Sequence, residues 1–456
     1  MEESKALTDY YLAGRKLGLL RCTASLTATT ISASAVLVAA DLVAARGLVG
    51  AWFNLAGGLG LVALGLFLAP RIRSFGSVTF ASFIGDLFGD PWLRRLASVI
   101  SVAAALSWLA LLVRATRLLT ATVLPGTGGM WLSTLLIGAV LAYTALGGQR
   151  AVAGSDVIQL GLIILGFAAL LIYVLPGLGS AWTALPAAHR SFPLAPGFGA
   201  GTLAAWALLY GLPHAVGPDI YSRLLSATDA SVARKACVIS GLAKMAFGIV
   251  LTLIVLASGA ATPGGAGGGG GGAGSGAHEG VIFGILTSAL PAPLGLLLLF
   301  ALLMAFLSSL DTVLLSASSI LAHDLIGPTL GGGPGAELRV ARIGGVALMG
   351  TAFGLAVATD LAAVGWFGLG FALFAGSVGP PVVIALLARR GPPSKGIVRL
   401  AIGGGLAGVA AAQIFQLATG LGTMGDLVVP GVVASTLFML AGIALRDGRP
   451  AVDPAS

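Results

Sequence analysis

Two adjacent serines within a long apolar stretch are the first residues in this sequence that suggest a binding function. Residues 305–312 read AFLSSLDT, and helical spacing of i, i+3 and i+4 puts Ala305, Ser308 and Ser309 on one face. The two hydroxyls and the Ala305 carbonyl are oxygen ligands of the kind that a hard monovalent cation binds. The pattern therefore predicts part of a cation site, with helix packing through small residues as the alternative interpretation.

Acidic residues in apolar stretches are the second feature that suggests chemistry, because a carboxylate is costly there and usually functional. Asp311 follows the serines in the same apolar run, and helix packing leaves it unexplained. Asp156 lies at the start of the apolar stretch 155–177, where a coupling role and a solvated boundary role are both open. Asp219 lies near the end of an apolar stretch, and we interpret it as a solvated boundary residue. Asp156 and Asp311 are therefore the candidate coupling carboxylates.

Two apolar stretches contain residues that interrupt a helix. Residues 23–34 read TASLTATTISAS, and these hydroxyls compete with the backbone for hydrogen bonds. Residues 211–219 read GLPHAVGPD, with two prolines and two glycines within eight residues. We predict a break in each stretch, with Ser32, Pro213 and His214 at a substrate cavity. For His214, hydrogen bonding to a free carbonyl of the broken helix is an equally good interpretation.

The composition indicates what kind of protein carries these residues. The chain has 456 residues, of which 57% are apolar and only 9% are charged, whereas soluble domains carry about 25% charged residues. This small number of charged residues cannot cover the surface of soluble globular domains. We therefore predict a single integral membrane unit. The 69 glycines and 21 prolines suit helices that pack closely and break where lipid does not reach the backbone.

Apolar stretches of about 20 residues, each long enough to cross a bilayer, define about twelve spans. Charged residues or clusters of glycine and proline separate them. The predicted fold is therefore all-α and integral to the membrane, with spans at 18–45, 48–70, 93–121, 130–147, 155–177, 200–224, 232–260, 292–325, 338–358, 361–388, 396–420 and 427–445.

The basic residues test this count, because lysine and arginine are retained on the cytoplasmic side of a membrane. With a cytoplasmic N-terminus, twenty of the 25 lie at cytoplasmic ends and loops, Arg223 among them. Those toward the outside are Arg46, Arg114, Arg117 and Arg190. Lys244 lies within the seventh span and is predicted to extend its ammonium toward the inner face. We therefore predict a multi-pass protein of the plasma membrane with both termini cytoplasmic.

Several other classes of function are not expected. The net charge of +8 does not indicate nucleic-acid binding, because the basic residues are spread over seven segments instead of one patch. Cys22 and Cys237 lie in apolar segments and are expected to be buried thiols, without disulfide or metal. The histidines have no metal-ligand spacing and no nucleophile and base pair appears, so an enzyme is not expected. The first fifteen residues lack the apolar core of a signal peptide.

The two predicted breaks lie in the first and sixth spans, five spans apart. Transporters made of two inverted five-helix repeats have a broken helix at the same point of each repeat, with solute and ion between them. We therefore predict a 5+5 inverted-repeat core. Its parts are a cytoplasmic segment (1–17), a first repeat (18–177), a second repeat (200–388) with a Gly-rich external loop (262–277), two peripheral helices (396–445) and a cytoplasmic tail (446–456).

Motifs along residues 9–390 resemble those of the sodium:solute symporter family, in the same order. They are DYYLAGR at 9–15, SLTA at 25–28 and ISA at 31–33 for the signature and first core helix, Tyr143-Thr144, Gly147-Gly148 and DVIQ at 156–159 for the fourth-to-fifth junction, Pro213-His214 with Arg223 for the sixth helix, and Ser308-Ser309, SASS at 316–319 and Asp324 for the eighth. The resemblance implies a LeuT-like inverted-repeat core. Family members commonly have an extra helix before the signature, so we expect a shortened form or a missing start.

The resemblance also implies the site residues. It implies a sodium site formed by the carbonyls of Ala28, Ile31 and Ala305 and the hydroxyls of Ser308 and Ser309, with no other metal. It implies that Asp156 is the nearby acid that helps sodium leave toward the cytoplasm. Ala35 and Val36 stand where the sugar-transporting branch carries a polar amide, which disfavours a sugar.

The predicted function is a sodium-coupled secondary symporter that imports a small organic solute by alternating access. An amino acid or monocarboxylate is favoured over a sugar, and Na+ is the coupling ion. The predicted partners are the solute and the lipid bilayer. Two alternatives are open: a proton-coupled carrier that uses Asp156 or Asp311, and a membrane sensor that binds the solute without moving it. The chain ends about ten residues after the last span without an output domain, which counts against the sensor.

Overall fold

The computed structural model describes residues 2–262, 280–287, 290–330, 333–358, 363–388, 393–419 and 424–447. The predicted external loop at 262–277 lies outside these ranges from residue 263 onward. Within the described ranges the chain is almost entirely helical, with two isolated β-bridges and no strand. The predicted all-α fold is confirmed.

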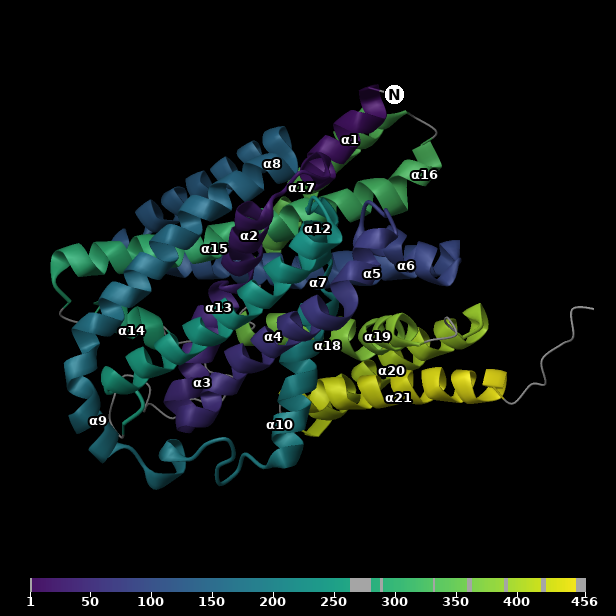
Figure 1. Ribbon diagram of the computed structural model, residues 1–456. Coiled ribbons are helices and arrows are strands. Elements are labelled where there is room, and N and C mark those ends of the chain that lie inside the picture. The colour runs from purple at the N-terminus through teal and green to yellow at the C-terminus, as the bar shows by residue number, and fades with distance from the viewer. Residues whose placement is uncertain are drawn as a thin grey trace, which may run out of the picture.

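The helices follow one another closely along the chain (Figure 1). Up to residue 184 they are α1 (Glu2–Leu12), α2 (Leu19–Thr30), α3 (Ala39–Arg46), α4 (Trp52–Ala63), α5 (Ala69–Ser74), α6 (Phe80–Phe88), α7 (Pro91–Val123), α8 (Thr127–Val174) and α9 (Leu178–Ala184). After it come α10 (Ala200–Trp206), α11 (Leu212–Val216), α12 (Pro218–Ser226), α13 (Ala230–Ala257), α14 (Val281–Thr287), α15 (Ala292–Ile320), α16 (Gly327–Leu330), α17 (Pro334–Ala358), α18 (Ala363–Ser377), α19 (Gly379–Leu387), α20 (Lys395–Thr419) and α21 (Met424–Asp447). Short π-helical turns extend several of them, at η2 (Ser34–Val38), η4 (Leu64–Leu68), η7 (Ala207–Gly211) and η8 (Leu321–Ile326).

In the described part of the chain, eight helical stretches are long and apolar enough to cross a membrane, and a shorter apolar helix covers Val428–Ala444. Some of these stretches join spans that the sequence separates. The stretch Thr127–Ala184 contains both the predicted fourth span, 130–147, and the predicted fifth span, 155–177. The predicted number of twelve spans therefore stays a prediction.

The long helix α8 is kinked at Gly148, between its two predicted spans. Gly148 has φ +55° and ψ −148°, a conformation outside the helix. A Cβ at this position would lie 2.5 Å from the carbonyl oxygen of Tyr10 in α1. The kink and the close approach of α1 therefore both require glycine.

We expect Gly148→Ala to lower the free energy of unfolding by about 1–3 kcal/mol, because alanine is strained in this backbone conformation and meets the backbone of α1. Gly154→Ala is the control, since Gly154 lies in the same helix with open space around it. The control should have unchanged or slightly higher stability. Thermal unfolding of the purified protein in detergent measures both variants, and equal melting temperatures would contradict the role given to Gly148.

Both predicted interruptions are present. α2 ends at Thr30, and Ile31 has φ −90° and ψ 65° before the helix resumes. The second break falls at Gly217, where ψ of 137° separates α11 from α12. Pro218 begins α12 without cost, because the first helical residue needs no backbone N–H. Helices that end inside the protein leave carbonyl and N–H groups without helical partners, and these groups are free to bind ligands.

The broken segments pack against one another and against α15. α2 contacts α8, α13 and α15, and α12 contacts both α2 and α15. α15 also packs along α7 and α8. Figure 1 shows α2, α12 and α15 close together in the middle of the bundle, with α20 and α21 side by side at its edge. The residues that suggested chemistry are therefore carried by helices that meet.

Candidate functional site

The end of α2 faces the two serines of α15. The Ser308 hydroxyl donates to the Ala28 carbonyl at 3.2 Å, and the Ser309 hydroxyl donates to the Thr29 carbonyl at 3.0 Å. Both hydroxyls also lie 3.3 Å from the Ala305 carbonyl. All five residues are buried. The contacts bring five oxygens together between the two helices.

Four of the five residues predicted to bind sodium take part in this cluster, and Ile31 does not. Ile31 lies at the break, and in the described part of the chain its carbonyl accepts no hydrogen bond from either serine. The Thr29 carbonyl stands there instead. The carbonyls of Ala28 and Thr29 come from the C-terminal end of α2, which is the negative end of its dipole and favours a cation. The donor set fits sodium, and the choice of the ligating oxygens stays a prediction.

Asp156 is fully buried, so the solvated boundary interpretation is wrong. Its Oδ2 accepts a 2.5 Å hydrogen bond from Ser25 and lies 3.8 Å from Nη2 of Arg223. Nε of Arg223 donates to the Ser25 hydroxyl at 3.0 Å. The other oxygen of Asp156, Oδ1, has no hydrogen-bond partner among the described residues. The carboxylate is therefore held on one side only.

Asp311 reaches the same arginine through Thr312. The Tyr143 hydroxyl donates to Oδ2 of Asp311, and Oδ1 lies 3.2 Å from the Thr312 hydroxyl oxygen. Arg223 donates to that same Thr312 oxygen. The Thr312 and Thr29 hydroxyl oxygens are 3.1 Å apart. We call the buried carboxylates of Asp156 and Asp311 and the guanidinium of Arg223 the Arg223 network. Through Thr312 and Thr29 this network reaches the oxygen cluster at the end of α2.

Three polar side chains lie deeper than the sequence predicted. Arg223 was expected at a cytoplasmic end but is fully buried. Lys244 was expected to reach the inner face, but it is 1% exposed and its Nζ donates to the Thr30 carbonyl at 2.6 Å. Asp219 was expected to be solvated, but it is 7% exposed. The helix breaks explain these errors, because they provide polar groups inside the protein that replace water as partners.

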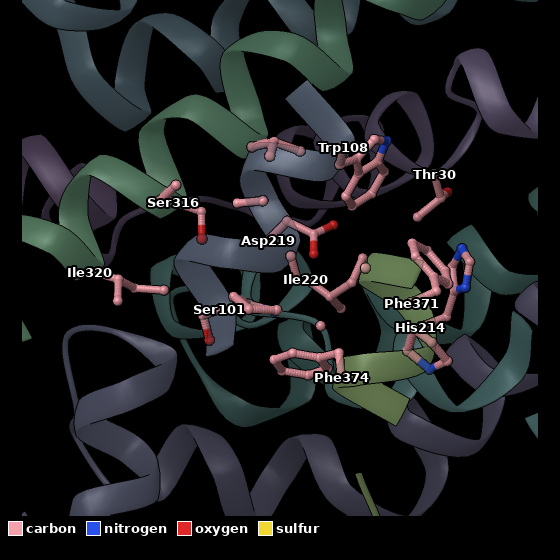
Figure 2. Close-up of a pocket in the computed structure, with 18 residues that line it drawn as sticks. Thr30, Ser101, Trp108, His214, Asp219, Ile220, Ser316, Ile320, Phe371 and Phe374 are labelled. Carbon is pink, nitrogen blue, oxygen red and sulfur yellow. The ribbon is translucent and has the colours of Figure 1, made fainter. Parts of the chain in front are cut away.

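A cavity of about 620 Å³, counting the space open to solvent, lies beside the breaks. Residues of α2, α7, α11, α12, α15 and α18 line it, and Figure 2 shows these side chains around the open space. Its walls are largely apolar, with the aromatic rings of Trp108, Phe371 and Phe374. Asp219 and Ser101 are polar residues on this wall.

The structure places two of the three predicted cavity residues on its wall. Pro213 and His214 line the cavity. His214 fits both interpretations that the sequence left open, because its Nδ1 is also 2.7 Å from the Tyr210 carbonyl oxygen. Ser32 is not among the lining residues, and its hydroxyl oxygen lies 2.8 Å from that of Ser34. The role of these residues in binding a solute stays a prediction.

Comparison with known proteins identifies the family. Residues 10–396 match the sodium:solute symporter family. This chain belongs to that family. A relative, the high-affinity proline transporter PutP of Bacillus subtilis (strain 168), is 32% identical over 179 residues. The matched stretch spans only about a third of each protein, 36% of this chain and 36% of PutP.

Solved structures of other proteins share the fold of this family member. A Na+-coupled sialic acid symporter in a substrate-bound outward-open state aligns with a TM-score of 0.79 and 16% identity, over 98% of this chain and 94% of that one. MhsT in complex with L-phenylalanine aligns with a TM-score of 0.58 and 16% identity, over 94% of this chain and 98% of that one. The predicted inverted-repeat membrane fold is confirmed, and the family is one of transporters, not enzymes.

Sequence reasoning gave no site role to several polar residues of this symporter's interior. Thr312 follows Ser308 by four residues and so shares its helix face, a spacing that could have found it. Asp219 follows directly after the Gly-Pro pair of the second break, which places it in the first turn of the helix that starts there. Tyr143 gives no such local signal, because its partner Asp311 is 168 residues away.

Proposed function

We propose that this protein uses a sodium gradient to import a small organic solute by alternating access. The observation that carries the proposal is that both helices that form the oxygen cluster, α2 and α15, also line the cavity. Thr30, which follows the cluster residue Thr29 in α2, lines the cavity. Val313, one turn after Ser309 in α15, lines it as well. Ion binding and solute binding at these places would act on one helix pair.

The serine contacts suggest how sodium would favour one state of the carrier. The hydroxyls of Ser308 and Ser309 donate to carbonyls of α2. A sodium ion would draw these hydroxyl and carbonyl oxygens onto itself and so hold α2 against α15. An ion that stabilises this arrangement favours the state that has it, and solute uptake then depends on the ion. Asp156, with its free Oδ1, is proposed to help the ion leave toward the cytoplasm.

An amino acid or a monocarboxylate is the proposed solute class, in preference to a sugar. Ala35 and Val36, where a polar amide would suit a sugar, support this proposal. The apolar wall of the cavity supports it too, because a sugar needs many polar partners. The relative PutP is a proline transporter, and the similar MhsT structure was solved in complex with L-phenylalanine.

The proposed location is the plasma membrane, with both termini in the cytoplasm. The family is one of multi-pass membrane transporters. The distribution of lysine and arginine between the loops, twenty against four, supports the orientation of the termini.

Uptake into proteoliposomes tests the coupling ion. We expect an inward sodium gradient to drive accumulation of proline or another member of a panel of amino acids and short carboxylates. A pH gradient in sodium-free buffer should drive none. Accumulation driven by the pH gradient would favour the proton-coupled alternative, with Asp156 or Asp311 as the proton site. Sodium-dependent binding of a panel member without accumulation would favour a sensor.

A further inference from the structure

The cavity wall carries one carboxylate that has no cation in direct contact among the described residues. Asp219 lies in the first turn of α12 and is 7% exposed. Among the described residues it forms no ion pair. The nearest arginine in sequence, Arg223, lies one turn further along α12, and its hydrogen bonds go to Ser25, Ser222 and Thr312. Arg223 attracts the Asp219 carboxylate without a direct contact, so the carboxylate can still pair with a ligand cation. In Figure 2 its oxygens face the space between Trp108, Thr30 and Phe371.

The other polar groups on the cavity wall add hydrogen-bond acceptors. Nδ1 of His214 lies 2.7 Å from the Tyr210 carbonyl, which can only accept, so Nδ1 carries the hydrogen. In the neutral ring Nε2 is then an acceptor. Ser101 is 2% exposed, and its hydroxyl has no hydrogen-bond partner among the described residues. A ligand with N–H groups would satisfy such a wall.

No cationic side chain lines the cavity in the part of the chain that is described. Lys244, close to His214, uses its ammonium on the Thr30 carbonyl. A solute with only a negative charge would therefore meet Asp219 with no cation opposite, which is unfavourable in a buried site. The aromatic faces of Trp108, Phe371 and Phe374 suit a positively charged nitrogen and an apolar body.

We propose that the cavity selects solutes that carry a protonated or quaternary amine on an apolar body, and that Asp219 is the residue that binds this amine. The inference rests on the proposed function, since it names the solute class of the same cavity. It divides the two classes proposed above: zwitterionic amino acids are accepted and simple monocarboxylates are rejected. Because Asp219 and Arg223 are one turn apart on α12, an amine on Asp219 would also lie close to the Arg223 network.

Two matched series of probes test the proposal at two sizes. The first is pyrrolidine, proline and cyclopentanecarboxylate, which share a five-membered ring and carry a cation, both charges or an anion. The second is phenethylamine, phenylalanine and 3-phenylpropionate. Binding to the purified full chain in detergent is measured as the rise in melting temperature. Each measurement is made in sodium buffer and in a buffer where potassium replaces sodium. We expect an amine-bearing member of at least one series to bind, and the anion of that series not to bind.

Variants assign the effect to Asp219. Asp219→Asn keeps the size of the side chain, and we expect it to weaken binding of the amine-bearing probe by about 10- to 100-fold. Asp219→Glu should restore part of that loss. Asp9→Asn is the control, because Asp9 is a partly exposed carboxylate that pairs with Arg150 and does not line the cavity. It should bind like the unmodified protein.

Three results would overturn the proposal: an anion that binds as tightly as its amine partner, an Asp219→Asn variant with unchanged probe preference, or no binding by any amine-bearing probe. The sodium dependence is read separately. Probe binding that depends on Asp219 but not on sodium would remove the proposed sodium coupling and leave the solute class standing. A sodium-dependent rise in melting temperature without amine selectivity would support the sodium coupling and remove the proposed solute class.

Discussion

Arg223→Gln is expected to lower the free energy of unfolding by about 3–5 kcal/mol, the largest effect of any single substitution considered for this protein. Arg223 is fully buried, lies 3.8 Å from the Asp156 carboxylate and donates to Thr312 beside Asp311. Removing the guanidinium leaves two buried carboxylates without a cation. Glutamine keeps hydrogen-bonding capacity, so the loss reports mainly the charge.

Thermal or denaturant unfolding in detergent measures this effect. Arg150→Gln is the control, because the Arg150 ion pair with Asp9 is shorter, at 2.9 Å, but is exposed. Exposed pairs contribute about 0–1 kcal/mol. The double variant Arg223→Gln with Asp156→Asn should regain part of the stability, since it removes one uncompensated charge. Arg223→Gln losing no more stability than Arg150→Gln would refute the Arg223 network.

The double variant Ser308→Ala with Ser309→Ala is expected to abolish sodium-dependent uptake at ordinary sodium concentrations. If each hydroxyl ligand contributes as much as a hydrogen bond to a charged group, about 1.5–3 kcal/mol, the sodium requirement rises by about 100-fold or more. The fold should be retained, because the lost contacts are neutral hydrogen bonds between α2 and α15, worth about 1 kcal/mol each. Sodium titration of uptake in proteoliposomes measures the change.

A matched serine pair in the same helix serves as control. Ser318 and Ser319 are buried, but their hydroxyls bond to the Leu315 carbonyl of their own helix, at 3.1 and 2.6 Å. Ser318→Ala with Ser319→Ala should therefore leave the sodium dependence unchanged. If the Ser308 and Ser309 variant takes up solute with the same sodium dependence as the unmodified protein, the assigned ion site is wrong.

The helix breaks show where reasoning from sequence works. Hydroxyl-rich residues 23–34 and the Gly-Pro cluster at 211–219 both predicted an interruption, and the chain leaves helical geometry at Ile31 and Gly217. These features depend on local chemistry, since proline lacks an N–H and hydroxyls compete for backbone groups. The depth of the neighbouring polar residues was not predicted. Asp219 was placed at the membrane boundary, and the ammonium of Lys244 was expected to reach toward the inner face, but both side chains are buried.

The sequence by itself determined that the protein is helical and membrane-embedded, where its helices break, and that Ser308 and Ser309 share a face. Each of these follows from composition or from spacing within one helix. Only the tertiary structure decided which groups meet: Asp156 with Ser25 and Arg223, Asp311 with Tyr143. Ser25 and Asp156 are 131 residues apart in the sequence, and Tyr143 and Asp311 are 168 residues apart. Hydrogen bonds and ion pairs act over a few ångströms, so partners on different helices are fixed by how the helices pack, which local spacing does not determine.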